Sequence, residues 1–204
     1  MQNIENIIFD LGGVLLDIDY NRTRDEFEKL GVTRFNEMYS QANADRLFQK
    51  LETGTIDEED FYKELNHSSG MNLSPDEIKK AWNAMLLTFR EDSLQFLDQL
   101  KNKYRIFLLS NTNKIHFASF DEIYYQTKRS KKFEEFFDKI FYSFEIGLRK
   151  PDATCYKWVL KDLNLNPERT LFIDDSIDNI NGANSVGIQT LLLSPGKRIE
   201  NLGL

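Results

Sequence analysis

The sequence predicts an α/β fold: a doubly wound parallel sheet, interrupted after its first strand by an inserted unit made of helices. Short apolar runs alternate with amphipathic helical stretches over most of the chain, whereas residues 20–90 contain helical patterns alone. Runs that are apolar on both faces are typical of parallel strands buried under helices. With 204 residues, the chain is long enough for such a core and a small second domain.

Five apolar runs have the length of a strand, and they are Ile7–Asp10, Arg105–Ser110, Lys139–Ser143, Leu171–Asp175 and Gln189–Leu193. Helical patterns lie between them, at Ser93–Lys103, Ala153–Leu163 and Ile177–Ser185. Alternation of strands and helices indicates a sheet covered by helices on both faces. We therefore assign residues 1–19 and 91–204 to this core.

Residues 20–90 are predicted to form a helical cap. Four amphipathic stretches lie in this segment, at Asn21–Leu30, Ala44–Leu51, Asp57–Leu65 and Pro75–Phe89, and we expect no strand among them. A unit inserted directly after the first strand lies at the carboxyl ends of the strands, where open α/β sheets bind ligands. The segment is therefore placed to act as a lid over a bound molecule.

Composition excludes several classes of function. The chain has 26 basic and 33 acidic residues, a net charge of −7, which argues against nucleic acid as a partner. A small anionic substrate remains compatible if a metal or a local lysine neutralises it. The single cysteine, Cys155, fits a reducing cytoplasm. Because there is no signal-peptide pattern and no apolar run near the ~18 residues of a membrane helix, we expect a cytoplasmic protein without membrane contact.

Polar side chains end three of the predicted strands and one loop, and they are Asp10, Ser110, Asn111, Asp174, Asp175 and, in the loop, Lys150. Parallel strands end at one edge of a sheet, so these groups are expected to converge there. Clustered carboxylates repel each other unless a cation lies between them, and all-oxygen ligation suits Mg²⁺. A carboxylate beside a metal, a lysine and a serine hydroxyl forms a phosphate cradle with a nucleophile inside it.

Each of these residues alone has an ordinary structural interpretation. An aspartate after a strand is most often a cap or turn residue, and a serine there is most often a helix N-cap. A single lysine is most often a solvated surface residue. The prediction of a site therefore depends on the combination of all these groups at one edge of the sheet.

Four segments, "IIFDLGGVL", "LLSNT", "GLRKP" and "FIDDSIDNINGA", resemble in order and spacing the four motifs of the haloacid dehalogenase superfamily. The resemblance covers essentially the whole chain and implies a Rossmann-like core with a helical cap. It also implies that Asp10 is the nucleophile and that Ser110, Asn111 and Lys150 bind the transferring group.

The resemblance further implies a Mg²⁺ ion held by Asp10, the main-chain carbonyl of Gly12 and Asp175, with Asp174 supporting the metal from beside it. The first three motifs also resemble bacterial α-D-glucose-1-phosphate phosphatases of this superfamily. The expected function is therefore hydrolysis of a small phosphorylated metabolite such as a sugar 1-phosphate, through an aspartyl-phosphate.

Gly12 departs from the superfamily pattern, because most phosphatases of the family carry there an aspartate that protonates the leaving group. Asp17, His116 and a cap residue are candidates to replace it, and a substrate hydroxyl or water could also serve. Dehalogenases of the family also lack that aspartate, so a 2-haloacid dehalogenase remains an alternative. A catalytically weak binding or regulatory protein of the same fold is the third interpretation.

Overall fold

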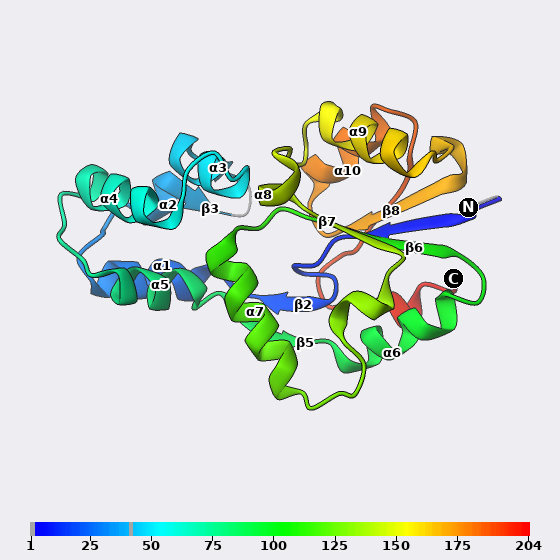
Figure 1. The fold of residues 1–204 in the computed structure, drawn as a ribbon, viewed down its shortest axis with the longest axis horizontal. Coiled ribbons are helices and arrows are strands. Elements are labelled where there is room, and N and C mark those ends of the chain that lie inside the picture. Colours follow the sequence, from blue (N-terminus) through cyan, green and yellow to red (C-terminus); the bar gives the residue numbers. More distant parts are fainter. Residues whose placement is uncertain (1–2, 41–42) are drawn as a thin grey trace.

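The computed structural model describes residues 3–40 and 43–204 and contains a parallel five-stranded sheet with the strand order β7-β6-β1-β8-β9 (Figure 1). Its strands are β1 (Asn6–Phe9), β6 (Arg105–Ser110), β7 (Lys139–Tyr142), β8 (Thr170–Asp174) and β9 (Gln189–Leu192). Each corresponds to one of the predicted apolar runs, which confirms the predicted fold class. From β1 the chain adds β6 and β7 on one side of the sheet and then β8 and β9 on the other side. The topological switch point therefore lies at the carboxyl end of β1.

Two layers of helices cover the sheet (Figure 1). One layer contains α8 (Ser143–Ile146), α9 (Ala153–Leu163) and α10 (Ile177–Asn184), and the other contains α6 (Glu91–Leu100) and α7 (Lys114–Gln126). Three short 3-10 helices complete the core, at η1 (Phe133–Phe136), η2 (Pro167–Arg169) and η3 (Ile199–Asn201). In β1, Ile8 packs in the cluster of α9 and α10, whereas Ile7 and Phe9 pack in that of α6 and α7. This alternation explains why the strand is apolar on both faces.

A second unit lies beyond one edge of the core and has its own cluster of buried apolar side chains (Figure 1). Its helices are α1 (Tyr20–Lys29), α2 (Phe35–Met38), α3 (Arg46–Glu52), α4 (Glu58–Ser69) and α5 (Pro75–Asn83). The side chain of Trp82 is fully buried at its centre, against Phe48 and Phe61. Ser74 and Glu77 form the capping box that starts α5.

The structure differs from the sequence analysis where the helical unit joins the core. The helix expected to reach Phe89 ends at Asn83, and Leu86–Phe89 forms strand β5, antiparallel to β2 (Leu16–Ile18). A two-residue pair, β3 (Tyr39–Ser40) and β4 (Asn43–Ala44), also lies in the segment where no strand was expected. Pairing with β2 overrides the local helical periodicity, because it satisfies the main chain of both connections.

The two connections between core and helical unit are joined by buried hydrogen bonds. The main-chain N–H of Asp19 donates to the carbonyl of Met85 at 2.9 Å. The hydroxyl of Thr23, which is fully buried, donates to the carbonyl of Trp82 at 2.9 Å and accepts from the N–H of Met85 at 3.0 Å. These contacts fasten the start of α1 to the end of α5.

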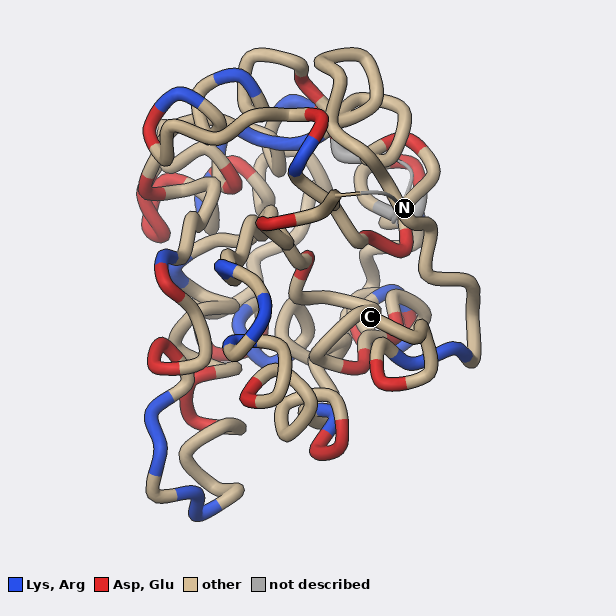
Figure 2. The backbone as a smooth tube through the Cα atoms, turned by 90° about the vertical axis from the view of Figure 1, so that its right-hand side faces the viewer, with Lys and Arg blue, Asp and Glu red and all other residues tan. Residues whose placement is uncertain are grey.

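Acidic and basic residues are interspersed along the backbone rather than segregated (Figure 2). This distribution accompanies the modest net charge of −7. Among the residues that the structure describes, no helix combines the length and the apolar character needed to cross a bilayer.

We expect Thr23→Val to destabilise the protein by roughly 1–3 kcal/mol, because an isosteric side chain would leave two buried main-chain groups unpaired. Urea unfolding measures the change. Thr33→Val, at an exposed position of the same unit, is the control and should leave the midpoint nearly unchanged. Equal midpoints for the two variants would contradict a structural role for the Thr23 hydroxyl.

Candidate active site

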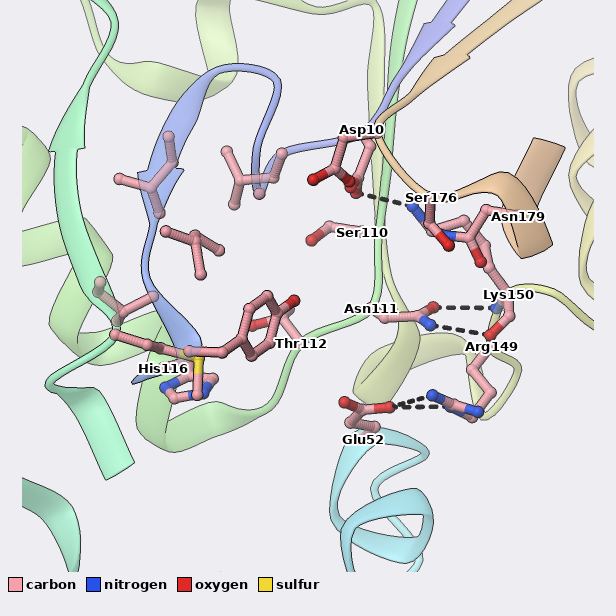
Figure 3. A pocket seen from close by; sticks show the side chains of 18 of the residues that line it. Asp10, Glu52, Ser110, Asn111, Thr112, His116, Arg149, Lys150, Ser176 and Asn179 are labelled. Atoms are coloured by element: carbon pink, nitrogen blue, oxygen red, sulfur yellow. Dashed lines mark hydrogen bonds and ion pairs between the residues drawn. The ribbon is translucent and has the colours of Figure 1, made fainter. Parts of the chain in front are cut away.

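A cavity of about 240 Å³ lies between the carboxyl edge of the sheet and the helical unit. Six of the residues predicted from the sequence line it, and they are Asp10, Gly12, Ser110, Asn111, Lys150 and Asp175. They come from three strand ends and two loops, and Figure 3 shows Asp10, Ser110, Asn111 and Lys150 around the same space. The structure therefore brings these groups together, as the common edge of parallel strands predicts.

The ammonium group of Lys150 lies between two carboxylates. Its Nζ is 2.7 Å from Oδ1 of Asp10 and 2.7 Å from Oδ2 of Asp174, and only 1% of its side chain is exposed. Burial opposes the charge of Lys150, but the two aspartates raise its pKa above the ordinary value. Lys150 is therefore a fixed positive charge at the end of β1.

The carboxylates that face the cavity are strongly affected by burial. Burial raises the pKa of Asp10 to about 7, against the attraction of Lys150, and it raises the pKa of Asp175 to about 6, with Asp174 adding to the effect. Both pKa values rise because a negative charge is less stable where water is largely excluded. A cation bound beside these carboxylates would favour their ionised forms.

Asp174 is fully buried, and protein groups already use both of its oxygens. Oδ2 accepts from Lys150 at 2.7 Å, Oδ1 accepts from the main-chain N–H of Ser176 at 2.8 Å, and the amide of Asn179 donates to both. These contacts give Asp174 a positioning role toward Lys150 and the loop that follows β8. The metal-supporting role that the resemblance implies for Asp174 stays a prediction.

Asp10, Asp174 and Asp175 each offer a carboxylate oxygen, and these oxygens lie within 4.8 Å of one another. Gly13 makes room for this group: its φ is +71°, and a Cβ there would lie 2.1 Å from Oδ2 of Asp175. Only glycine adopts that conformation at no cost while admitting so close a carboxylate. This hard-oxygen donor set fits Mg²⁺.

Asn111 fixes the loop that carries Lys150. Its Oδ1 accepts from the main-chain N–H of Lys150 and its Nδ2 donates to the carbonyl of Lys150, both at 2.9 Å (Figure 3). The amide predicted to bind phosphate is thus engaged with the protein. Beside it, the side chain of Ser110 is directed into the cavity, close to Asp10 (Figure 3).

The opposite wall carries an ion pair that the sequence analysis missed. Glu52 of α3 accepts from Nε of Arg149 at 2.8 Å and from Nη2 at 2.7 Å (Figure 3). The hydroxyl of Tyr39 donates to Glu52 at 3.3 Å. Burial raises the pKa of Glu52, while Arg149 opposes that shift. Because Glu52 follows Phe48 by one helical turn, it occupies an apolar-face position, which was the signal available in the sequence.

The structure also places the two named candidates for the missing proton donor. Asp17 accepts from Arg90 at 2.7 Å and from Arg198 at 3.1 Å, and these arginines lower its pKa although burial opposes them. It is absent from the described residues that line the cavity. His116 does line the cavity, but burial lowers its pKa to about 3, so its ring is neutral. Near neutral pH Asp17 is therefore an ionised carboxylate and His116 a neutral imidazole, so neither holds the proton of a general acid.

Comparisons with known proteins support one family. A family model for haloacid dehalogenase-like hydrolases matches residues 4–187. A D-ribitol-5-phosphate phosphatase of Bacteroides thetaiotaomicron is 33% identical over 192 residues, which are 92% of this chain and 90% of that protein. A sesquiterpene phosphatase of Aspergillus oryzae is 29% identical over 194 residues, 92% of this chain and 88% of that protein.

Solved structures agree with these relatives. A haloacid dehalogenase family enzyme of Bacteroides thetaiotaomicron, crystallised with magnesium and inorganic phosphate, superimposes with a TM-score of 0.91 at 33% identity, covering 98% of both chains. The L-2-haloacid dehalogenase of Xanthobacter autotrophicus, at 16% identity and a TM-score of 0.58 over 93% of this chain and 77% of that one, shares the fold. With its four motifs gathered at one edge of the sheet, this chain belongs to the haloacid dehalogenase-like hydrolase family.

Proposed function

We propose that this protein is a Mg²⁺-dependent phosphatase that hydrolyses a small phosphorylated sugar or polyol through an aspartyl-phosphate on Asp10. The observation that carries the proposal is the buried Lys150 ammonium, 2.7 Å from Asp10, beside a cluster of carboxylates that fits a cation. The two relatives matched over most of the chain are named as phosphatases, and a related enzyme was crystallised with magnesium and phosphate.

In the first step, a carboxylate oxygen of Asp10 attacks phosphorus, and the bond between phosphorus and the leaving-group oxygen breaks. Lys150 and the hydroxyl of Ser110 bind the phosphoryl oxygens and offset their charge. A Mg²⁺ ion held by the carboxylates of Asp10 and Asp175 would supply further positive charge for those oxygens. In the second step, water attacks phosphorus, which releases inorganic phosphate and restores the carboxylate of Asp10.

The alternative of a 2-haloacid dehalogenase is less well supported. The carboxylates of Asp10, Asp174 and Asp175 outnumber the single Lys150 ammonium beside them, which disfavours a carboxylate substrate in the absence of a cation. The similarity to dehalogenase structures is limited to the fold.

The position of the phosphate on the substrate follows from two arguments that diverge. Gly12 supplies no acid, so a leaving group that needs no proton, such as the anomeric oxygen of a sugar 1-phosphate, is favoured. The relative named for D-ribitol 5-phosphate instead favours a primary alkyl phosphate. We retain the sugar 1-phosphate as the prediction from this chain's own residues.

Asp10→Asn should lower kcat for phosphate release by at least ~10³-fold, because it removes the covalent nucleophile while keeping its size. Excess EDTA should abolish the activity of the wild-type enzyme, and Mg²⁺ should restore it. Phosphate release from p-nitrophenyl phosphate, with chloride release from 2-chloropropionate measured in parallel, provides the test.

Asp162→Asn, in a surface ion pair with Lys139, is the matched control and should keep wild-type rates. Near-normal phosphate release by Asp10→Asn would refute the mechanism, and full activity in EDTA would refute the metal. Chloride release without phosphate release would establish the dehalogenase instead. Release of neither product would favour a binding or regulatory protein.

Leaving-group quality should govern the rates. We expect p-nitrophenyl phosphate and glucose 1-phosphate to be hydrolysed faster than glucose 6-phosphate and ribitol 5-phosphate, since assistance from a general acid is worth about 10²–10⁴-fold where it is needed. Steady-state kcat/KM values for the four esters make the comparison. Equal values would show that another group donates the proton.

Gly12→Asp tests whether the missing general acid causes this dependence on the leaving group. A Cβ at position 12 would lie 2.5 Å from Cδ1 of Ile18, so the variant is best combined with Ile18→Val, which removes that methyl group. The double variant should accelerate alkyl esters more than aryl esters relative to Ile18→Val alone.

Glu52→Gln should lower kcat/KM about 10-fold, because it removes the charge that links the helical unit to the loop before Lys150. Steady-state kinetics on glucose 1-phosphate and ribitol 5-phosphate measure the loss. Glu64→Gln, in an exposed pair with Lys50 of the same unit, is the control. A loss no larger than that of the control would show that the Glu52–Arg149 pair contributes nothing to substrate turnover.

A further inference from the structure

One buried group on the cavity wall is not used by the proposed chemistry. His116 belongs to α7 and lines the cavity together with Asp10, although only 6% of it is exposed. Its ring stacks on Trp82 with centroids 4.5 Å apart and an interplanar angle of 17°. Its main-chain N–H donates to the side chain of Asn113, the N-cap of α7, at 3.0 Å. Both the backbone and the ring of His116 are therefore held in place.

A second contact decides which ring nitrogen carries the proton. Nδ1 of His116 lies 2.8 Å from Oδ1 of Asn83, at the end of α5. A carbonyl oxygen only accepts, so Nδ1 is the protonated nitrogen of the neutral ring. Nε2 consequently has a free lone pair and acts as an acceptor.

Nε2 is buried and has no hydrogen-bond partner among the residues that the structure describes. Buried polar atoms in native proteins are almost always paired, with protein, water or ligand. Because the ring of His116 lines the cavity, a water or ligand atom that reaches Nε2 from there must be a hydrogen-bond donor.

We propose that Nε2 of His116 accepts a hydrogen bond from a hydroxyl of the leaving group, and that His116 thereby selects phosphorylated sugars and polyols over phosphate esters without hydroxyls. The inference rests on the proposed phosphatase function and adds the residue that recognises the substrate. Asn83 is a positioning residue, because it fixes the tautomer that leaves Nε2 free to accept.

The chemistry of the surrounding wall favours a hydroxyl over other donors. Glu52 and Tyr39 line the same cavity, and the carboxylate of Glu52 is already engaged with Arg149. The phosphate end of the substrate is expected beside Lys150, so the rest of the molecule extends toward the helical unit. A neutral hydroxylated chain matches this half-polar wall, and its hydroxyls can donate to Nε2.

His116→Phe removes the acceptor and keeps a flat ring for stacking on Trp82. We expect kcat/KM to fall about 10-fold on glucose 1-phosphate and ribitol 5-phosphate, and to stay within about 2-fold on p-nitrophenyl phosphate, whose leaving group has no hydroxyl to donate. Asn83→Leu should cause a smaller loss with the same selectivity. His67→Phe, at an exposed position of α4, is the matched control.

Singly deoxygenated analogues of the better sugar or polyol ester identify the hydroxyl. Removal of the hydroxyl that contacts His116 should cost the wild-type enzyme about 10-fold and His116→Phe nothing further. Equal losses on p-nitrophenyl phosphate and the sugar ester would overturn the inference, as would wild-type kinetics for His116→Phe on both. In either case, the phosphatase function would still hold if the wild-type enzyme hydrolyses p-nitrophenyl phosphate.

A spectroscopic test needs no change at His116. In Asp10→Asn, labelled with ¹⁵N-histidine, His116 should show a protonated Nδ1 and a lone-pair Nε2. Adding glucose 1-phosphate or ribitol 5-phosphate should shift the Nε2 resonance, and inorganic phosphate alone should not. An unchanged Nε2 signal at saturating ester would refute the contact.

Discussion

The active edge of this protein depends on the burial of a single ammonium group. Lys150 is removed from water between Asp10 and Asp174, each 2.7 Å away. A buried charge is tolerated only where opposite charges and hydrogen bonds compensate for its lost hydration, so Lys150 ties together the ends of β1 and β8. Asn111, at the end of β6, holds the main chain of Lys150 through two further hydrogen bonds. Three strands and one loop are thereby fixed relative to one another.

The same arrangement leaves an excess of negative charge that has a function. Asp174 is engaged with Lys150, Ser176 and Asn179, whereas Asp10 and Asp175 line the cavity with pKa values raised by burial. Carboxylates that lie close together and are poorly solvated favour binding of a divalent cation, because the cation offsets the repulsion between them. The positive Lys150 and a cation together make the place suitable for a phosphoryl group, while the tight turn at Gly13 brings Asp175 close to the end of β1.

The helical unit completes the cavity on its other side. Glu52 reaches across to Arg149, the residue directly before Lys150, so the position of the helical unit is linked to the phosphate end of the site. His116 connects the two parts differently: it belongs to a core helix, yet Trp82 and Asn83 of the helical unit hold its ring. The proposed recognition of substrate by His116 and the packing between core and helical unit therefore involve the same side chains, Trp82 and Asn83.

The sequence by itself determined the sheet, the presence of helices on both of its faces and the convergence of most groups of the candidate site, but not helix α7. Buried parallel strands appear in the sequence as continuous apolar runs. Because parallel strands end at the same edge of the sheet, the groups that follow them converge there. Asp10, Ser110 and Asp175 could be named for that reason, whereas Lys150 was named from a loop that leads into a helix. The tertiary structure alone decided the β2–β5 pair, the ion pair of Glu52 with Arg149, 97 positions away, and the free lone pair of His116. Local periodicity encodes which face of an element is buried, but the partner of a buried polar group is chosen only when distant segments pack.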